Sequence, residues 1–238
     1  MVYHGYENGF RTLGRQMLLD PIEWTEDDWF RTRGGDLSMP LPKPQPNSSG
    51  PHGAPRSDDF SRDNMGIGLS FFSPGTDQSG RARLEDGALI VTAAGTSPHD
   101  CAPLSFIAGD LAYEVSVEME LGAGAQGGLL LFYNQNLYSG VGFDQQRRFT
   151  FRAGRSIDYT PVPSPAGQKV HLRIVNDHHD VTIYYGVNGQ TWTQHEMQME
   201  TSGLNHNVGD GFLSLRPALY AAGQSEVRFR KLRYRALA

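Results

Sequence analysis

A two-residue period of apolar side chains constrains the fold of this chain more than any other feature. Apolar residues occupy every odd position from Leu111 to Leu121, while the even positions after Ala112 hold three glutamates and Ser116. A period of two is typical of a β-strand with one buried face and one solvated face. The segment therefore predicts a strand whose glutamates face solvent.

Turn sequences between similar segments predict antiparallel hairpins. A polar cluster at 176–180 separates two alternating segments, 170–174 and 181–185, and such clusters favour a turn. Glu85-Asp86-Gly87 and Asn188-Gly189 supply the residue types that adopt the positive φ angles of tight hairpins. Each of these sequences is expected to reverse the chain between two neighbouring strands.

Two further segments point to strands of special character. The run from Gly127 to Tyr133 is continuously apolar, which predicts a strand covered on both faces or lining a concave surface. The apolar positions change phase between Phe229 and Leu232, which indicates a β-bulge at Arg230-Lys231. No long stretch has a helical period. The chain is therefore predicted to be all-β, an antiparallel β-sandwich or jelly roll.

Composition excludes several classes of protein. With 238 residues and 38% hydrophobic content, the chain can form a large core and is too apolar for disorder. A net charge of −5 makes nucleic acid and anionic membranes poor partners. The single cysteine, Cys101, excludes internal disulfides and multi-thiolate zinc sites. No apolar run approaches the roughly 18 residues of a membrane span.

A composition shift divides the chain. In residues 34–57, 14 of 24 positions are Gly, Pro or Ser, which predicts an extended linker. Residues 1–33 are too short to fold alone, and residues 58–238 carry the predicted sandwich. The first residues show no secretory signal. Localisation is left open: cytoplasmic if the apparent N-terminus is genuine, and secreted otherwise.

The first 30 residues carry three motifs in order. They are Tyr3-His4-Gly5-Tyr6, Leu13-Gly14-Arg15-Gln16, and Pro21-Ile22-Glu23-Trp24 followed by Asp28-Trp29. These motifs resemble the last propeller blade of glycoside hydrolase family 43, in which a Y-H-x-Y strand precedes L-G-R-[EQ] and P-[IV]-x-W with a D-G-W-type turn. Asp28 stands where glycine is usual, so the resemblance is weaker at that turn.

The remainder is similar to the concanavalin-A-like β-sandwich that follows the propeller in β-xylosidase-type members of that family. The similar segments are 59–61, 127–133, 138–143 and 228–234. The resemblance implies a terminal segment of a five-bladed propeller at 1–33, a linker at 34–57 and a jelly roll at 58–238.

The resemblance implies an inverting glycosidase whose three catalytic carboxylates lie on earlier blades. Those blades are not in this sequence, so no catalytic residue is assigned and the chain alone is expected to be inactive. Inversion needs two carboxyl groups about 6.5–9.5 Å apart. The adjacent pairs Asp27-Asp28 and Asp58-Asp59 cannot flank one bond, because neighbouring side chains point to different faces.

Two residues take candidate roles from the resemblance. His4 matches a histidine that contacts a hydrated calcium ion on the propeller axis; the alternative is a strand histidine that only packs or hydrogen-bonds. Arg15 matches an arginine in the family's sugar pocket; the alternative is a surface ion pair with Glu7 or Asp20. Calcium is expected only with a complete propeller, since it needs six to eight oxygen ligands. Lys231, at a position where an acidic residue is common, argues against calcium in the sandwich.

Three functions are compatible with these observations. The first is the C-terminal portion of an exo-acting glycosidase for xylo- or arabino-oligosaccharides, in which a loop aromatic narrows the pocket; the candidates are Tyr138, Phe143 and Tyr220. The second is a stand-alone sugar-binding sandwich with an aromatic platform, although core filling is the favoured role of Trp192. The third is an assembly domain that docks on a propeller chain or another subunit. The candidates for the aromatic platform of the second function are Tyr133, Tyr138, Trp192 and Tyr220.

The remaining polar clusters are expected to be structural. His178-His179 lies on a short turn, where two adjacent histidines rarely converge on one metal ion. The basic residues between 228 and 235 alternate along a predicted strand and are expected to share one solvated face.

Overall fold

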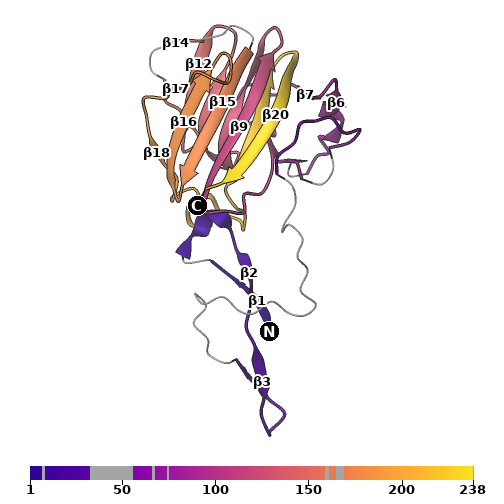
Figure 1. Ribbon diagram of the computed structural model, residues 1–238, viewed down its shortest axis with the longest axis vertical. Coiled ribbons are helices and arrows are strands. Elements are labelled where there is room, and N and C mark those ends of the chain that lie inside the picture. Colours follow the sequence, from indigo (N-terminus) through magenta and orange to yellow (C-terminus); the bar gives the residue numbers. More distant parts are fainter. Residues whose placement is uncertain are drawn as a thin grey trace.

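The computed structural model describes residues 1–6, 9–32, 56–65, 68–73, 75–158, 161–164 and 169–237. Two eight-stranded antiparallel sheets face each other as a sandwich, and the N-terminal strands extend below it (Figure 1). The described part contains one α-helix, α1 (His206–Gly209), and two short 3-10 helices. The all-β sandwich predicted from the sequence is confirmed.

The first sheet, here the β10 sheet, is built around a long central strand. It contains, in spatial order, β13 (Arg155–Ser156), β12 (Arg147–Arg152), β11 (Leu137–Phe143), β10 (Ala125–Asn134), β19 (Arg216–Gly223), β8 (Leu104–Ser105) and β5 (Ser70–Phe71), with β14 (Val162–Pro163) also paired to β12.

The second sheet, here the β9 sheet, contains the strand with the alternating glutamates. Its order is β17 (Thr193–Gln194), β16 (Asp180–Gly186), β15 (Lys169–Asp177), β9 (Ala112–Leu121), β20 (Glu226–Ala236), β7 (Ala88–Thr92) and β6 (Ala82–Glu85), with β18 (Met199–Glu200) also paired to β16.

The N-terminal extension consists of two small hairpins. Strand β1 (Val2–Gly5) pairs with β2 (Gln16–Leu19), and β3 (Ile22–Trp24) pairs with β4 (Phe30–Thr32). The 3-10 helix η2 (Arg11–Leu13) lies between β1 and β2. Most of the predicted linker 34–57 lies outside the described residues.

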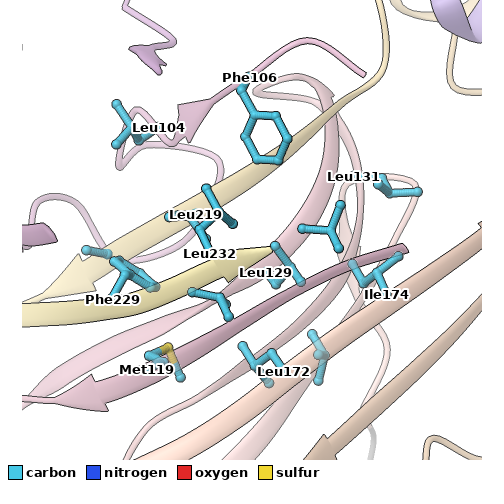
Figure 2. Close-up of a cluster of buried hydrophobic side chains, with 14 of the residues drawn as sticks. Leu104, Phe106, Met119, Leu129, Leu131, Leu172, Ile174, Leu219, Phe229 and Leu232 are labelled. Carbon is cyan, nitrogen blue, oxygen red and sulfur yellow. The ribbon is translucent and has the colours of Figure 1, made fainter. Parts of the chain in front are cut away.

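The core lies between the two sheets and is formed by the inward-facing residues of each strand. Met119 and Leu172 of the β9 sheet face Leu129 and Leu219 of the β10 sheet, and all four are almost completely buried (Figure 2). Burying one such side chain contributes about 1.5–3 kcal/mol to the free energy of unfolding. The period of two therefore places each apolar set on the face that the other sheet covers.

Strand β10 is buried on both faces, as its continuous apolar run predicts. Leu129 and Leu131 join the central core, while Leu130 and Phe132 join a second cluster on the outer face of the sheet. Tyr220 lies in that outer cluster. A Cβ added to Gly142 would lie 1.7 Å from the Tyr220 hydroxyl oxygen, so only glycine leaves room for this ring. The tyrosine hydroxyl has no hydrogen-bond partner among the described residues.

Local turn and bulge predictions are also confirmed. Asp86 and Gly87, between β6 and β7, have φ angles of 51° and 64°, the combination expected of a tight two-residue hairpin. The register of β20 against β9 shifts between Arg230 and Arg233. Lys231, inside this bulge, has a φ of 52°.

The expectation that the glutamates of β9 face solvent is wrong for Glu118. Its side chain is 6% exposed, and its carboxylate lies 2.6 Å from the Lys169 ammonium and 3.1 Å from that of Lys231. Burial by itself raises the pKa of Glu118, but hydrogen bonds from the two lysines outweigh it, so the pKa is lowered. The neighbouring strands and the bulge, rather than the local period, determine this environment.

The double-sheet core predicts the cost of removing one inward-facing side chain. Leu172→Ala is expected to lower the free energy of unfolding by about 2–5 kcal/mol, because the sheets cannot collapse fully around the cavity. Val187→Ala, at a residue that is 48% exposed, is the control and should change it by no more than about 0.5 kcal/mol. Urea unfolding followed by tryptophan fluorescence measures both, and equal effects would contradict this assignment of the core.

Candidate functional site

The N-terminal extension docks on one end of the sandwich through η2. Thr12 and Leu13 are buried, and the carbonyl oxygen of Thr12 accepts a hydrogen bond of 2.7 Å from the Leu215 amide. The Thr12 hydroxyl lies 3.0 Å from Nε2 of His179, and the Phe10 ring lies 4.9 Å from the His179 ring. Sequence positions about two hundred residues apart are therefore joined at this end of the molecule.

A cluster of four side chains forms beside this docking contact; we call Tyr6, Arg15, His206 and Phe212 the Arg15 cluster. The guanidinium carbon of Arg15 lies 4.1 Å from the centre of the Phe212 ring and 5.9 Å from that of Tyr6. The Tyr6 ring stacks on His206 with a centroid separation of 5.3 Å. The Tyr6 hydroxyl lies 3.0 Å from Nδ1 and 3.1 Å from Nε2 of His206. The cluster combines two residues of the extension with two of the sandwich.

The sandwich contributes His206 and Phe212 on one short segment, 205–213, which we call the α1 loop. Asn205 caps α1, since its side-chain oxygen accepts a 3.0 Å hydrogen bond from the Asn207 amide. The Tyr133 hydroxyl, at the end of β10, donates to the carbonyl oxygens of Asp210 at 2.8 Å and Gly211 at 3.1 Å. The α1 loop is thus fixed to the central strand of the β10 sheet.

The chemistry of the Arg15 cluster suits a neutral polyol. The Arg15 Nε–H donates to the Tyr6 hydroxyl at 3.4 Å, and stacking on Phe212 covers a face of the guanidinium rather than its in-plane donors. Among the described residues no ion pair joins Arg15 to Asp20, while Glu7 lies outside them. No carboxylate of the described residues pairs with the remaining guanidinium donors, which suit hydroxyl groups, and Phe212 offers an aromatic face for a sugar ring.

His4 does not join this cluster. It lies on β1 opposite Met17 of β2, and its side chain is exposed. The described ranges contain no group of three or more His, Cys, Asp or Glu side chains that could hold a metal ion. The calcium role of His4 remains a prediction.

The prediction that Tyr138, Phe143 or Tyr220 is an exposed loop aromatic is wrong. Tyr138, Phe143 and Tyr220 lie within strands of the β10 sheet and are at most 3% exposed. Phe212, which sequence reasoning missed, is 72% exposed. Its signal in the sequence was the preceding Gly209-Asp210-Gly211, a turn-forming run that ends on a large aromatic residue.

The other aromatic candidates form no exposed platform. Tyr133 is buried. Trp192, for which core filling was expected, instead lies partly exposed on the outer side of the β9 sheet. The guanidinium carbon of Arg173 lies 4.5 Å from the Trp192 ring and 4.3 Å from the Tyr184 ring. Trp192 therefore packs on an arginine, a cation–π contact.

The two histidines of the 178–179 turn differ in environment. His178 is exposed and its Nδ1 lies 2.6 Å from a carboxylate oxygen of Asp177. The sequence predicts a solvated turn, but Thr12 and Phe10 of the extension cover His179. Burial lowers the pKa of His179. The docking contact thus depends on a histidine that is favoured in its neutral form.

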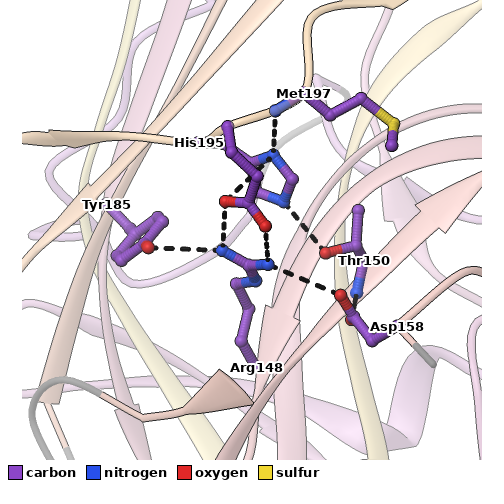
Figure 3. A network of polar contacts seen from close by, with 7 residues as sticks. Arg148, Thr150, Asp158, Tyr185, His195 and Met197 are labelled. Atoms are coloured by element: carbon purple, nitrogen blue, oxygen red, sulfur yellow. Dashed lines mark hydrogen bonds and ion pairs between the residues drawn. The ribbon is translucent and has the colours of Figure 1, made fainter. Parts of the chain in front are cut away.

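A second polar network connects the two sheets (Figure 3). Arg148 of β12 is almost fully buried and binds both carboxylate oxygens of Glu196, while its Nη1–H also donates to the Tyr185 hydroxyl at 3.3 Å. A carboxylate oxygen of Asp158 lies 3.5 Å from Arg148. The hydrogen bonds from Arg148 lower the pKa of Glu196 to about 2. Glu196 therefore stays ionised and cannot serve as a catalytic acid near neutral pH.

His195 is a second buried member of the same network. Its Nδ1 accepts a 3.0 Å hydrogen bond from the Met197 amide, which places the proton of the neutral ring on Nε2. Nε2 then donates to the Thr150 hydroxyl at 2.9 Å. Burial, followed by the charge of Arg148, lowers the pKa of His195. The network connects the two sheets through the buried Arg148 and His195, while the Glu196 side chain is 65% exposed.

Comparison with protein families shows to which family the sandwich is related. Residues 57–235 match the family described as the beta xylosidase C-terminal Concanavalin A-like domain. The chain belongs to this family. The matched range covers both large sheets of the β-xylosidase C-terminal domain described above, except for the final residue of β20. A comparison with curated proteins gives no match.

Solved structures share the fold over nearly the whole chain. The GH43 BlXynB protein from Bacillus licheniformis has a TM-score of 0.77 and 22% identity, covering 99% of this chain and 50% of that chain. Xylan beta-1,4-xylosidase from Bacillus halodurans C-125 has a TM-score of 0.74 and 18% identity, covering 94% and 48%. The Bacteroides ovatus xyloglucan PUL GH43B has a TM-score of 0.80 and 16% identity, covering 96% and 49%.

These structural likenesses establish the fold, including that of most of the N-terminal extension. The chain spans about half the length of each of these solved chains. In the described part of the chain, no helix is long and apolar enough to cross a membrane.

The buried histidines predict that the domain loses stability in mild acid. A buried neutral histidine has a lower pKa in the folded than in the unfolded chain, so the unfolded chain takes up more protons as the pH falls below about 6.5. The free energy of unfolding should therefore be greatest above about pH 7 and decrease towards pH 5. Unfolding in urea at several pH values measures this slope.

His195→Gln tests the contribution of the sheet-connecting network to that slope. Glutamine does not titrate, so the variant should lose less stability than the parent between pH 7 and pH 5. The control is His4→Gln, at an exposed position. A His195→Gln slope identical to those of the parent and the control would refute this role of His195.

Proposed function

We propose that this chain is the C-terminal part of an exo-acting, inverting glycosidase for xylo- or arabino-oligosaccharides. Its catalytic carboxylates belong to propeller blades outside these 238 residues. The observation that carries the proposal is the stacking of Phe212, from the sandwich, on Arg15 of the family 43-like Leu-Gly-Arg-Gln motif. The sandwich thereby contributes directly to the surface around a sugar-binding arginine.

The Arg15 cluster supplies binding groups, not acid–base groups. The guanidinium donates hydrogen bonds to sugar hydroxyls, and Phe212 packs against the apolar face of a sugar ring. Because Phe212 stands on a loop fixed from the sandwich, it restricts the space beyond Arg15. A pocket narrowed in this way favours short substrates cleaved from their ends.

Exposed apolar side chains and open strand edges of the N-terminal extension support the proposal that it packs against further propeller strands. Met17, Trp24 and Trp29 are about 70% exposed or more, and they lie on or next to two-stranded hairpins whose edges are unpaired in the described residues. Isolated hairpins of this kind are marginal in water. Docking against further propeller strands would cover the apolar side chains and the open edges.

Catalysis itself is proposed to follow the inverting scheme. A carboxylate base removes a proton from water, which attacks the anomeric carbon while a carboxylic acid protonates the leaving oxygen. The two groups must stand about 6.5–9.5 Å apart across the sugar. The described carboxylates of Glu196 and Asp158 both contact Arg148 and do not meet this requirement. His4 would join a calcium site only when the other blades supply the oxygen ligands.

The stand-alone sugar-binding alternative is less well supported, because Tyr133, Tyr138 and Tyr220 of its aromatic platform are buried.

Hydrolysis of nitrophenyl xyloside and nitrophenyl arabinofuranoside tests the proposal. The chain alone should be inactive, and co-expression with the adjoining upstream coding region should give activity. In the active protein, Arg15→Gln should lower kcat/KM at least about tenfold, since a hydrogen bond from a charged donor contributes about 1.5–3 kcal/mol. Phe212→Ala should raise KM and increase cleavage of longer substrates relative to the disaccharide.

Arg11→Gln is the matched control, because Arg11 is exposed on η2 outside the Arg15 cluster, and it should leave kcat/KM unchanged. Activity of the isolated chain would overturn the placement of the carboxylates elsewhere. An Arg15→Gln enzyme with normal kcat/KM would overturn the binding role of the cluster.

A further inference from the structure

A second concave site lies next to the α1 loop and takes no part in the Arg15 cluster. It is a pocket of about 590 Å³, within the range of about 300–1,000 Å³ typical of small-ligand sites. Two hairpin turns of the β10 sheet and the end of α1 form its walls. Its lining includes Asn136, Arg152, Arg155, Val208 and Asp210.

The two arginines of this pocket oppose each other directly. Arg152 of β12 and Arg155 of β13 are cross-strand partners, joined by Ala153 and Gly154 with φ angles of 47° and 80°. Directly opposed residues of a hairpin have side chains on the same face of the sheet. Like charges in that arrangement repel and destabilise the pair.

No carboxylate in the described residues forms an ion pair with either arginine. Glu200 interacts electrostatically with Arg152, but its carboxylate accepts a 2.6 Å hydrogen bond from the Ser202 amide. Asp210 is the acidic residue in the pocket lining. The hairpin therefore holds two guanidinium groups on one face, with Glu200 and Asp210 as the nearby acidic residues. An anion bound between the two arginines would relieve the repulsion that remains.

We propose that this pocket binds a sugar bearing a carboxylate, with Arg152 and Arg155 sharing the carboxylate group. The planar guanidinium matches a carboxylate with two parallel hydrogen bonds. Asn136 supplies an amide for hydroxyl groups, and Val208, which is 66% exposed, supplies an apolar surface for the ring. The choice of a sugar as the carrier of the anion rests on the proposed function, whereas the anion site itself does not.

The α1 loop separates this pocket from the Arg15 cluster. His206 and Phe212 contact the cluster, while Val208, Gly209 and Asp210 line the pocket. The Asn134 amide donates a 2.6 Å hydrogen bond to the Gly209 carbonyl oxygen, and the Tyr133 hydroxyl contacts the next two carbonyl oxygens, so this part of the loop is fixed to β10. The pocket and the Arg15 cluster thus use different residues of the same loop.

Isothermal titration calorimetry with the full chain tests this site. The probes are xylotriose carrying one glucuronic acid group, unsubstituted xylotriose, and inorganic phosphate. The acidic oligosaccharide should bind, more weakly as sodium chloride is raised from 50 to about 300 mM, and the neutral one should bind at least about tenfold more weakly. Phosphate should bind more weakly than the acidic oligosaccharide.

Arg152→Gln and Arg155→Gln should each raise the Kd for the acidic oligosaccharide at least about tenfold, without lowering the melting temperature, because both side chains are exposed. Arg147→Gln is the matched control on the same strand; its arginine stacks on Phe149, and the variant should bind normally.

Equal binding of the neutral and acidic oligosaccharides, or unchanged Kd in both variants, would overturn the proposal. Phosphate binding as tight as that of the acidic oligosaccharide would overturn the sugar part of it. Since the assay needs no hydrolysis, its result is independent of the glycosidase test.

Discussion

The rest of the structure depends on strand β10, which is covered on both faces. Its inward-facing leucines close the core against the β9 sheet, and its outward-facing residues pack in the second cluster. Its last residues, Tyr133 and Asn134, hold the α1 loop by hydrogen bonds to three backbone carbonyl oxygens. A single strand therefore determines both the packing of the sandwich and the position of the residues around Arg15 and the second pocket.

The sequence predicted features whose causes are local. The strands of the sandwich, the Asp86-Gly87 turn and the bulge at Lys231 follow from period, φ preference and phase within a few residues. Glu118 and His179 escaped prediction because their environments come from other strands and from the N-terminal extension. The contact of Phe212 with Arg15 could not be predicted for a related reason, because only the docking of η2 brings Arg15 beside Phe212.

The evidence for the sandwich and for the Arg15 cluster differs in kind. The family match covers 57–235 and includes Phe212, whereas Arg15 lies in the extension, whose relationship to family 43 rests on three short motifs and on a shared fold. The contact between Arg15 and Phe212 physically connects these two parts. Under the proposed function, this contact is the route by which the sandwich would shape the surroundings of Arg15.

The pairing of Tyr220 with Gly142 carries a consequence for how this domain can diversify. The tyrosine ring fills the outer face of the β10 sheet, and any side chain larger than that of glycine at 142 would collide with its hydroxyl. Opening that face would require shortening residue 220 before or together with any change at 142, because either large residue excludes the other. New recognition surfaces are therefore more accessible to evolution in the turns at the end of the sandwich, where a substitution can alter chemistry without first dismantling the packed aromatic layer.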